Sequence, residues 1–296
     1  MADSSFSAEV CNWLETSGFE CFLTKKEEDL FFQLSVIHHT LKVMEIKLIE
    51  TGKWSVLYTK TEYNAYLERQ NKQRTKGVSS IILWEDLWWS KKTIVQSRIS
   101  ALLGKSIRIP GRLTYVSRLS KEIAAEFLKN NHLQGSVSAK YRYGLYLPLR
   151  YFRVLPPDFA ADLDSQDLLV AVASFSNARI FSKENKPFRS HELIRFANLL
   201  NTTVVGGLDK LINAFIKDFQ PDDIMTYADL EWSDGKGYSR LGFEKISLKP
   251  PMTFLLDLNT LDRLPDKKLD DNSDFLNISN AGSIKFVRTI KKLLNS

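Results

Sequence analysis

The sequence is poor in the residues that build metal and redox sites. Its two cysteines, Cys11 and Cys21, have no CxxC partner and no histidine cluster beside them, so a zinc site is not expected. Isolated cysteines fit a reducing compartment. No apolar run approaches the ~18 residues that a membrane-spanning helix needs, and the N-terminal MADSSFSAEV lacks the basic and apolar regions of a secretory signal. We therefore expect an intracellular, cytoplasmic protein without membrane contact.

The remaining composition is that of a soluble globular protein. Hydrophobic residues make up 44% and charged residues 26% of the chain, which are ordinary values. A length of 296 residues suggests about two domains at the usual ~150 residues each. The sequence contains neither an internal repeat nor a low-complexity segment, and it carries no signal for an oligomeric state.

Positive charge is concentrated in residues 66–120. The whole chain has a net charge of +6, but this segment holds eleven Lys or Arg against three acidic residues, a net charge of +8. Trp84, Trp88, Trp89 and Tyr115 lie among the basic residues. A basic segment with interspersed aromatics suits a phosphate backbone and predicts DNA as a partner. The alternative is an ordinary solvated helical face.

Residues 1–106 predict a mixed α/β domain. The spacing of apolar residues predicts a helix near the N-terminus, and two aliphatic runs predict a hairpin that turns at His38–Thr40. Further elements follow up to a helix that ends at Gly104. The expected helices are 6–17, 62–77 and 91–104, and the expected strands are 29–37, 41–50, 54–59 and 79–84.

Residues 107–256 predict a second α/β domain. Ser120 can cap a helix that ends near His132, and a second helix follows the Gly206-Gly207 pair. Residues 153–167 are rich in proline and aspartate and predict a loop insertion. Strands are expected at 141–147, 168–176, 223–230 and within 245–258, and 191–200 is a strand or a short helix. The tail 257–296 is expected to be polar and irregular, with a terminal basic helix.

The order of elements in the second domain resembles the GNAT acyltransferases. A glycine pair opens a helix in VVGGLDKLINAFIKDF, the strand DIMTYADL follows, and Tyr238 precedes Leu-Gly-Phe in GYSRLGFEKI. In that family a glycine-containing loop at a helix N-terminus binds the pyrophosphate of coenzyme A. The resemblance, over residues of about 115–255, implies a GNAT-like mixed sheet with flanking helices and Tyr238 as general acid. It implies acetyl-CoA or another acyl-CoA held by Val205, Gly206, Gly207 and Leu208.

The glycine loop departs from the usual R/Q-x-x-G-x-G/A. Asn201 stands at the position of the Arg or Gln, and Val204 at the position of the first glycine. The loop therefore lacks one glycine and one basic residue. A different cofactor, or none, is the alternative.

A narrower resemblance is to phage proteins of the phage Mu type that modify DNA bases on a GNAT-like scaffold. His132 in FLKNNHLQG, Glu192 and Arg195 in HELIRF, Asp229 in Tyr-Ala-Asp and then Tyr238 match that group's elements in order. Asp229 could accept a proton or orient a base amine, and His132 could exchange protons near neutral pH. Glu192, Arg195 and Trp232 would contact the substrate, Arg195 being suited to a phosphate.

Each of these residues also has a purely structural interpretation. Gly206-Gly207 can be a turn into a helix, and Asp229 can cap the turn after its strand. Tyr238 can be a half-buried core tyrosine. His132 can be a cation at a helix C-terminus.

Residues 79–104 resemble a segment of the very-short-patch-repair-like homing endonucleases. The match rests on Glu85-Asp86, Trp88, Lys91-Lys92 and Ser97-Arg98-Ile99. It implies a restriction-endonuclease-like mixed sheet with flanking helices, and Lys91, Lys92 and Arg98 as DNA contacts.

A magnesium site is the further expectation from this resemblance. Asp29, Glu45 and Lys47 have the broad Asp…Glu-x-Lys form that holds Mg²⁺ in restriction-type nucleases. The family's catalytic histidine is absent from residues 62–77. A charge pair on an exposed strand is the alternative interpretation of Glu-x-Lys.

The expected fold class is thus α/β (α+β). The first hypothesis is a DNA-associated enzyme, of phage or mobile-element type, with a GNAT-like group-transfer domain. The alternatives are a homing or restriction-type Mg²⁺-dependent endonuclease and a DNA-binding protein without catalysis.

Overall fold

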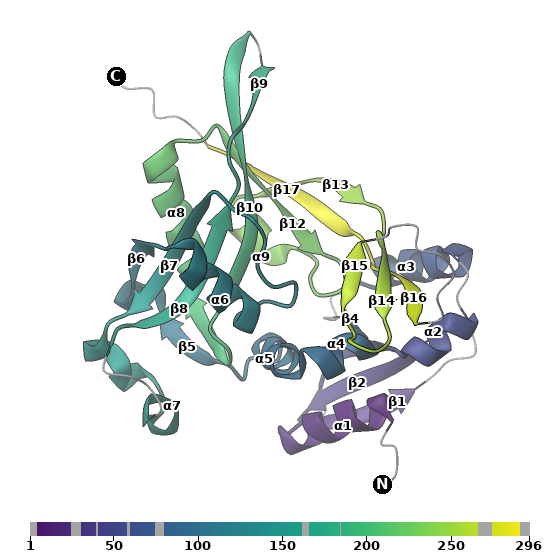
Figure 1. Ribbon diagram of the computed structural model, residues 1–296. Helices are drawn as coiled ribbons and strands as arrows, with labels where there is room; N and C mark the ends of the chain where they lie inside the picture. Colours follow the sequence, from purple (N-terminus) through teal and green to yellow (C-terminus); the bar gives the residue numbers. More distant parts are fainter. Residues whose placement is uncertain are drawn as a thin grey trace. The chain divides into compact units, whose positions relative to one another are not determined.

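The structure is a computed structural model that describes residues 5–24, 31–39, 41–57, 60–74, 80–161, 166–183, 185–265 and 274–290 (Figure 1). The chain forms two compact units, each assembled from three segments. The first unit comprises Met1–Lys92, Ala228–Lys236 and Leu248–Ile284, and the second comprises Thr93–Tyr227, Gly237–Ser247 and Lys285–Ser296. The units are therefore interleaved along the chain and do not follow the contiguous boundaries predicted at residues 106 and 256.

The first unit contains a four-stranded mixed sheet. β1 (Glu20–Thr24), β2 (Phe32–His38) and β3 (Leu41–Ile49) are antiparallel, and β4 (Ser80–Trp84) runs parallel to β3. The β2–β3 hairpin agrees with the turn predicted at His38–Thr40. The helices around this sheet are α1 (Phe6–Thr16), α2 (Thr51–Leu57), α3 (Lys60–Arg74) and α4 (Glu85–Ser90).

The strand predicted at 54–59 is wrong, because Thr51–Leu57 is the helix α2. The Trp54 side chain is fully buried, its ring packs against Tyr63 and Trp84, and its Nε1 donates to the Asn277 carbonyl at 2.7 Å. Aromatic and β-branched residues favoured a strand in the sequence, but their preference depends on context. Packing of the Trp54 ring in an aromatic core decides the conformation here.

The C-terminal stretch predicted to be polar and irregular contains strands. β14 (Thr253–Asp257) pairs with β15 (Arg263–Pro265) and β16 (Phe275–Ser279), and β17 (Ser283–Thr289) occupies residues expected to begin a terminal helix. Leu256, Ile278 and Phe286 are each at most 2% exposed. The buried apolar residues of this stretch therefore lie in sheets. The polar residues around them had led to the prediction of an irregular tail.

A cluster of charged groups is buried in the first unit. Arg263 forms a bidentate ion pair with the fully buried Asp86, with N···O distances of 2.7 and 2.9 Å. Glu231 is 2% exposed and accepts from the Trp84 indole at 2.9 Å, while its carbonyl accepts from the Ile82 N–H at 2.7 Å. These bonds hold the segment Ala228–Lys236 against the end of β4.

The second unit contains an eight-stranded sheet. Its order is β13-β17-β12-β10-β8-β7-β6, and β9 pairs with β10 beyond this path. The remaining bounds are β5 (Ile107–Pro110), β6 (Tyr115–Arg118), β7 (Tyr141–Leu147), β8 (Leu168–Phe175), β9 (Arg179–Lys183), β10 (Lys186–Asn198), β11 (Thr202–Val205), β12 (Asp223–Asp229), β13 (Glu244–Lys249), α5 (Lys92–Leu102), α6 (Lys121–Asn131), α7 (Pro157–Ala161), α8 (Gly207–Phe219) and α9 (Lys236–Arg240). β5 and β11 form a separate parallel pair, and α7 lies in the predicted loop insertion.

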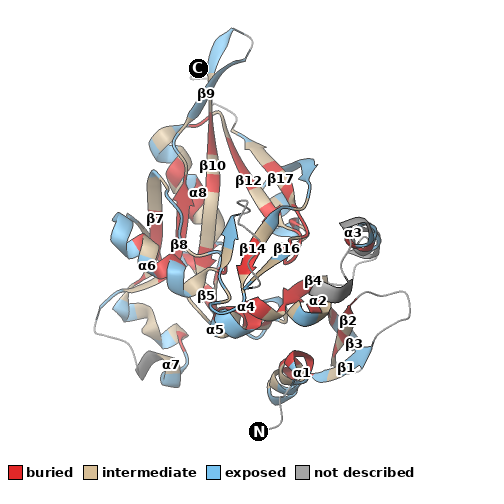
Figure 2. Cartoon of the chain, turned by 45° about the vertical axis from the view of Figure 1, so that its right-hand side comes forward, coloured by how far each residue is buried: buried red, intermediate tan, exposed pale blue. Residues whose placement is uncertain are grey.

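Helices cover both faces of this sheet. Phe175 of β8 stacks on Phe215 of α8 with ring centroids 4.1 Å apart. Val172, three residues earlier and on the opposite face, packs with Phe127 and Leu128 of α6. Figure 2 shows the buried residues in the centre of the sheet and the exposed β9–β10 hairpin that projects from it.

The predicted fold class is confirmed: the protein is α/β, with mixed sheets and flanking helices. The predicted order of glycine pair, helix, strand and tyrosine is found in Gly206-Gly207, α8, β12 and Tyr238 of α9. No helix in the described part of the chain is long and apolar enough to cross a membrane.

Glu231 gives a prediction about stability. Burial, and next the neighbouring Asp229 carboxylate, raise the pKa of Glu231 from 4.5 to about 8. A carboxyl whose pKa is raised by folding costs stability as the pH rises from its unfolded pKa through its folded pKa. We expect Glu231→Gln, which keeps an acceptor for Trp84, to raise the thermal midpoint at pH 8.5 by about 2–4 °C per kcal/mol gained, and the gain to vanish near pH 4.5.

Thermal unfolding followed by circular dichroism across this pH range measures the effect. Glu68→Gln, at an exposed position of α3, is the matched control. A gain that does not depend on pH, or equal behaviour of the two variants, contradicts the prediction.

Candidate functional site

β10 and β12 are parallel neighbours whose pairing stops early. Ser190–Glu192 pairs with Asp223–Met225, although β10 continues to Asn198 and β12 to Asp229. At the next position the Thr226 hydroxyl donates to the Leu193 carbonyl at 3.0 Å. A side chain therefore occupies the acceptor that a backbone N–H would use in a continuing ladder.

A bulge marks the same place in β10. The register of β10 against β8 shifts between Leu193 and Arg195. A bulge bends its strand and increases the local twist, and such bulges are common beside active sites. The end of pairing with β12 and the bulge against β8 thus fall at one point of the sheet.

Tyr238 of α9 lies at this point. Its hydroxyl hydrogen-bonds the Thr226 hydroxyl, and its ring contacts Phe243 and Phe286 at centroid distances of 5.7 Å. Burial raises the pKa of the Tyr238 hydroxyl, and the Thr226 hydrogen bond and the nearby Arg98 guanidinium only partly oppose this. The phenol is therefore protonated at neutral pH. Arg98, predicted as a DNA contact, is here a neighbour of the predicted general acid.

A cavity of about 460 Å³ lies where the β8–β9 loop meets β10 and β12. Among the residues predicted as site residues, Glu192 lines it. Burial raises the pKa of the Glu192 carboxyl, and Arg195, Arg179 and Lys285 oppose the rise. The cavity thus has one carboxyl surrounded by cations. Its lining residues are Ser176, Asn177, Ala178, Arg179, Ser190, Glu192, Met225 and Tyr227.

Tyr238 and Glu192 approach the end of pairing from opposite faces of the sheet. His191 pairs with Ile224 and packs on Phe215 of α8 at 5.0 Å, so the α8 face carries Ile224 and, two residues on, Thr226. Glu192 pairs with Met225 on the other face. The Tyr238 hydroxyl therefore lies on the α8 face, and the cavity lies on the other.

A row of three polar side chains crosses the cavity face. Ser174 of β8 lies between Arg142 of β7 and Arg195 of β10 as direct cross-strand neighbours. Arg142 Nε, Ser174 Oγ and Arg195 Nε are buried and have no hydrogen-bond partner among the described residues. Burial also lowers the pKa of Arg195, with Glu192 opposing. Unsatisfied buried donors are rare in native proteins, so this row gives the cavity face a capacity for hydrogen bonds.

Asp229, Trp232 and His132 make contacts typical of residues that stabilise turns, a core and a helix end. Asp229 Oδ1 accepts from the Glu231 N–H at 2.9 Å, which caps the turn after β12. Alternation along β12 places Asp229 on the face opposite Thr226. Trp232 is 3% exposed within the first unit. His132 ends α6, and its Nδ1 accepts from the Gln134 N–H at 3.1 Å.

The predicted cofactor loop forms a tight turn into α8. Gly206 has φ 74° and precedes the first helical residue, and a Cβ at Gly207 would lie 2.9 Å from the Val204 side chain. The charges around the turn are mixed. Asp209 stands in the first turn of α8, while the Lys210 ammonium donates to the carbonyls of Gly111, at 3.0 Å, and Thr114.

The other predicted basic residues belong to the first unit. Lys92 pairs with Glu9 and lies 5.5 Å from the Trp88 ring. Burial lowers the pKa of Lys91, although Asp262 partly opposes this. These cations have partners within their own unit.

The predicted metal set is only partly described. Lys47 is 2% exposed, hydrogen-bonds Gln33 and lies 3.5 Å from Glu45. Burial acts to raise the pKa of Glu45, but Lys42 and Lys47 together lower it. Asp29 lies outside the described residues. Within the described ranges no group of three His, Cys, Asp or Glu side chains could hold a metal ion.

Several residues of the cavity face had no signal in a motif. Arg142, Ser174 and Arg179 come from different strands and meet only through strand pairing. Tyr227 belongs to the predicted Tyr-Ala-Asp element, but its place on the cavity wall was not predicted. The sequence signal for the cavity wall was the alternation of side chains along a strand. Tyr227 lies two residues from Met225, and Ser190 lies two residues from Glu192, so each pair shares one face of its strand. Thr226 could be found only as the position at which pairing stops.

No protein-family model matches the chain, and no curated protein matches it. Among solved structures, it is similar to a Bacillus subtilis acetyltransferase in complex with CoA (10% identity, TM-score 0.33, covering 60% of this chain and 99% of that one). It is also similar to Arabidopsis thaliana NAA60 in complex with acetyl-CoA (9%, 0.34, 60% and 99%). A third similar structure is the KacTA–DNA complex (14%, 0.30, 56% and 92%). With TM-scores below 0.5, these likenesses alone do not assign a family.

Proposed function

We propose that the second unit is a GNAT-like acyltransferase that modifies nucleic acid. The observation that carries this proposal is the end of β10–β12 pairing at Thr226, with the Tyr238 hydroxyl bonded to Thr226. The end of pairing between these two strands is the place at which a GNAT-type fold would hold its acyl donor. Within the second unit, residues 93–120 hold five Lys or Arg and no acidic residue, which supports nucleic acid as the acceptor.

The backbone of the turn before α8 fits the pyrophosphate of an acyl-CoA. The positive φ of Gly206 and the crowding at Gly207 require glycine, and the first N–H groups of a helix favour an anion. Val205, Gly206, Gly207 and Leu208 would hold the group. Asp209 in the first turn weakens the charge complementarity. When bound, an acyl-CoA supplies a thioester carbonyl that an amine can attack.

Two side chains at the end of β10–β12 pairing, one on each face of the sheet, would carry the two proton transfers. Tyr238 holds a proton on the α8 face, because burial keeps its hydroxyl neutral, and can donate it to a leaving thiolate. Glu192, on the cavity face, can accept a proton from an attacking amine. The amine would enter through the cavity that Glu192 lines. The roles predicted for Asp229 and His132 stay predictions, and no step is assigned to them.

Tyr238→Phe tests the general acid. It keeps the contacts with Phe243 and Phe286 but removes the proton, so we expect kcat to fall by about 100-fold or more with the acetyl-CoA Kd unchanged. Acetyl transfer to oligonucleotides is measured by mass spectrometry of the nucleosides, and binding by calorimetry. Tyr146→Phe, in a tyrosine stacked on Tyr115 away from this point, is the control. A wild-type protein that neither binds nor transfers the acetyl group refutes the proposal.

Glu192→Gln tests the base through the pH profile. Because burial raises the pKa of Glu192 above 4.5, kcat/KM of the wild type should fall as the pH drops through this raised pKa. The Gln variant should lose about 100-fold or more in rate at neutral pH and show no such limb. Glu126→Gln, exposed on α6, should behave as the wild type. An unchanged acid limb in Glu192→Gln assigns the base to another group.

A Mg²⁺-dependent endonuclease in the first unit is the second candidate function. Its support is Lys47, which is 2% exposed beside Glu45 on β3, since lysine is seldom buried so fully. This candidate predicts that supercoiled plasmid is nicked in MgCl₂ and that Lys47→Ala abolishes the nicking, while Lys121→Ala, at an exposed position of α6, does not. Absence of nicking by the wild type contradicts it.

A further inference from the structure

The β9–β10 hairpin has a cationic and aromatic strip on one of its faces. In its antiparallel register Lys183 lies opposite Lys186, Phe181 opposite Phe188, and Arg179 opposite Ser190. Residues directly opposite each other share a face. These six side chains therefore form one strip. The opposite face carries Ile180, Ser182, Pro187 and Arg189.

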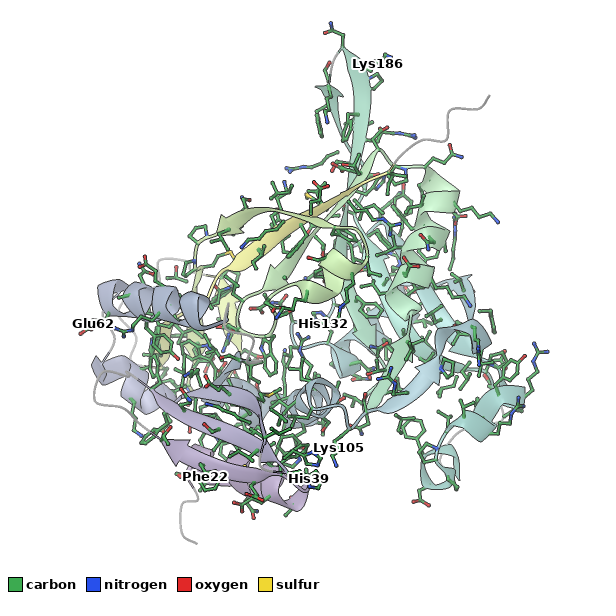
Figure 3. The ribbon with its side chains drawn as sticks, turned by 180° about the vertical axis from the view of Figure 1, so that it is seen from behind. Phe22, His39, Glu62, Lys105, His132 and Lys186 are labelled. Carbon is green, nitrogen blue, oxygen red and sulfur yellow. The ribbon has the colours of Figure 1, made fainter. Side chains whose placement is uncertain are left out.

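The strip combines cations with an aromatic pair, which suits a partner that carries both negative charges and planar rings. Phe181 is 49% exposed, and its ring lies 5.0 Å from that of Phe188. The Lys183 ammonium lies 4.9 Å from the Phe188 centroid. By sequence, residues 179–190 hold four basic residues and one acidic residue. Figure 3 shows Lys186 at the tip of the hairpin, pointing away from the sheet.

The strip continues into the cavity wall. Arg179 and Ser190, at the base of the hairpin, both line the cavity. Glu192 follows Ser190 on the same face of β10. A chain that follows the strip from the tip to the base therefore arrives at the Glu192 carboxyl. A volume of about 460 Å³ is within the range of small-molecule sites and suits a single base.

We propose that this strip binds single-stranded nucleic acid and directs one of its bases into the cavity. Phe181 and Phe188 stack on unpaired bases, and Lys183, Lys186 and Arg179 pair with phosphates. Stacking on aromatic rings beside a row of cations is how proteins hold single strands without reading their sequence. A duplex keeps its bases stacked on one another and offers these rings no free base face. The fate of the base in the cavity rests on the proposed function, whereas the binding does not.

Fluorescence anisotropy with a labelled single-stranded oligonucleotide tests the binding. We expect Lys183→Ala with Lys186→Ala to weaken binding by about tenfold or more in moderate salt, and to lower the slope of log Kd against log salt by about 1.4, two phosphate contacts at ~0.7 each. Phe181→Ala should weaken binding by about fivefold or more without changing the slope. A duplex of the same sequence should bind more weakly than the single strand.

The matched control removes the same charge elsewhere in the second unit. Lys217→Ala with Lys245→Ala changes two exposed lysines, on α8 and β13. This variant should bind as the wild type. Equal losses of oligonucleotide affinity in both double variants would mean that only the net charge of the protein matters, and would overturn the inference. If the wild type binds neither oligonucleotide, the strip serves another class of partner, a protein among them, and the inference fails.

The outcome is separable from that of the proposed function. Acetyl-CoA binding by calorimetry should be the same in the hairpin variants and the wild type, and coincident circular dichroism spectra show that the variants fold. If the wild type binds no acetyl-CoA but the hairpin variants lose oligonucleotide binding, the acyltransferase proposal fails and the nucleic-acid strip stands. If acetyl-CoA binds but Phe181→Ala and the double lysine variant bind DNA normally, the inference about the strip fails and the acyltransferase proposal is unaffected.

Discussion

The early end of pairing between β10 and β12 is the constraint on which the candidate site depends. Two parallel strands would ordinarily continue their ladder. Here the Thr226 hydroxyl takes the Leu193 carbonyl, and β10 bulges against its other neighbour at the same residues. One threonine thus has two tasks, since its hydroxyl also bonds Tyr238. Removing that hydroxyl would leave a buried carbonyl and a buried phenol each short of a partner, and both losses are costly.

The local parts of this arrangement were predictable from the sequence. A glycine pair before an amphipathic helix, a strand, and a tyrosine followed by Leu-Gly-Phe specify α8, β12 and α9 because each depends on short-range spacing. The place of Tyr238 in α9 follows from the same spacing, and its catalytic role stays a prediction. Glu192 was singled out through its motif, and its role stays a prediction. Its position on the cavity wall was not predicted, because this depends on which face of β10 is turned to the cavity.

The non-local parts were not predictable. Arg142, Ser174 and Arg195 form a row only because three strands from distant segments adopt one register, and a register slip of one residue would separate them. Asp229 and Tyr238 stood nine residues apart and suggested a pair. Alternation along β12 sends Asp229 to the other face from Thr226, where it caps a turn. The interleaving of the units, with β14 to β16 far along the chain from β4, had no local signal either.

The distribution of charge between the faces has a chemical consequence. On the α8 face the Tyr238 phenol is kept neutral by burial, and the Arg98 charge acts on it. On the cavity face the carboxyl of Glu192 is balanced between burial, which favours its protonated form, and three cations, which favour the carboxylate. An anionic acceptor that entered the cavity would engage those cations and weaken their hold on Glu192. Its pKa would then rise, and the carboxylate would become a stronger base when the acceptor is in place. A neutral acceptor would leave the cations, and the basicity of Glu192, unchanged. Under the proposed function, the arrangement would favour an acceptor that carries phosphate, and it would link recognition of the acceptor to the proton transfer that follows.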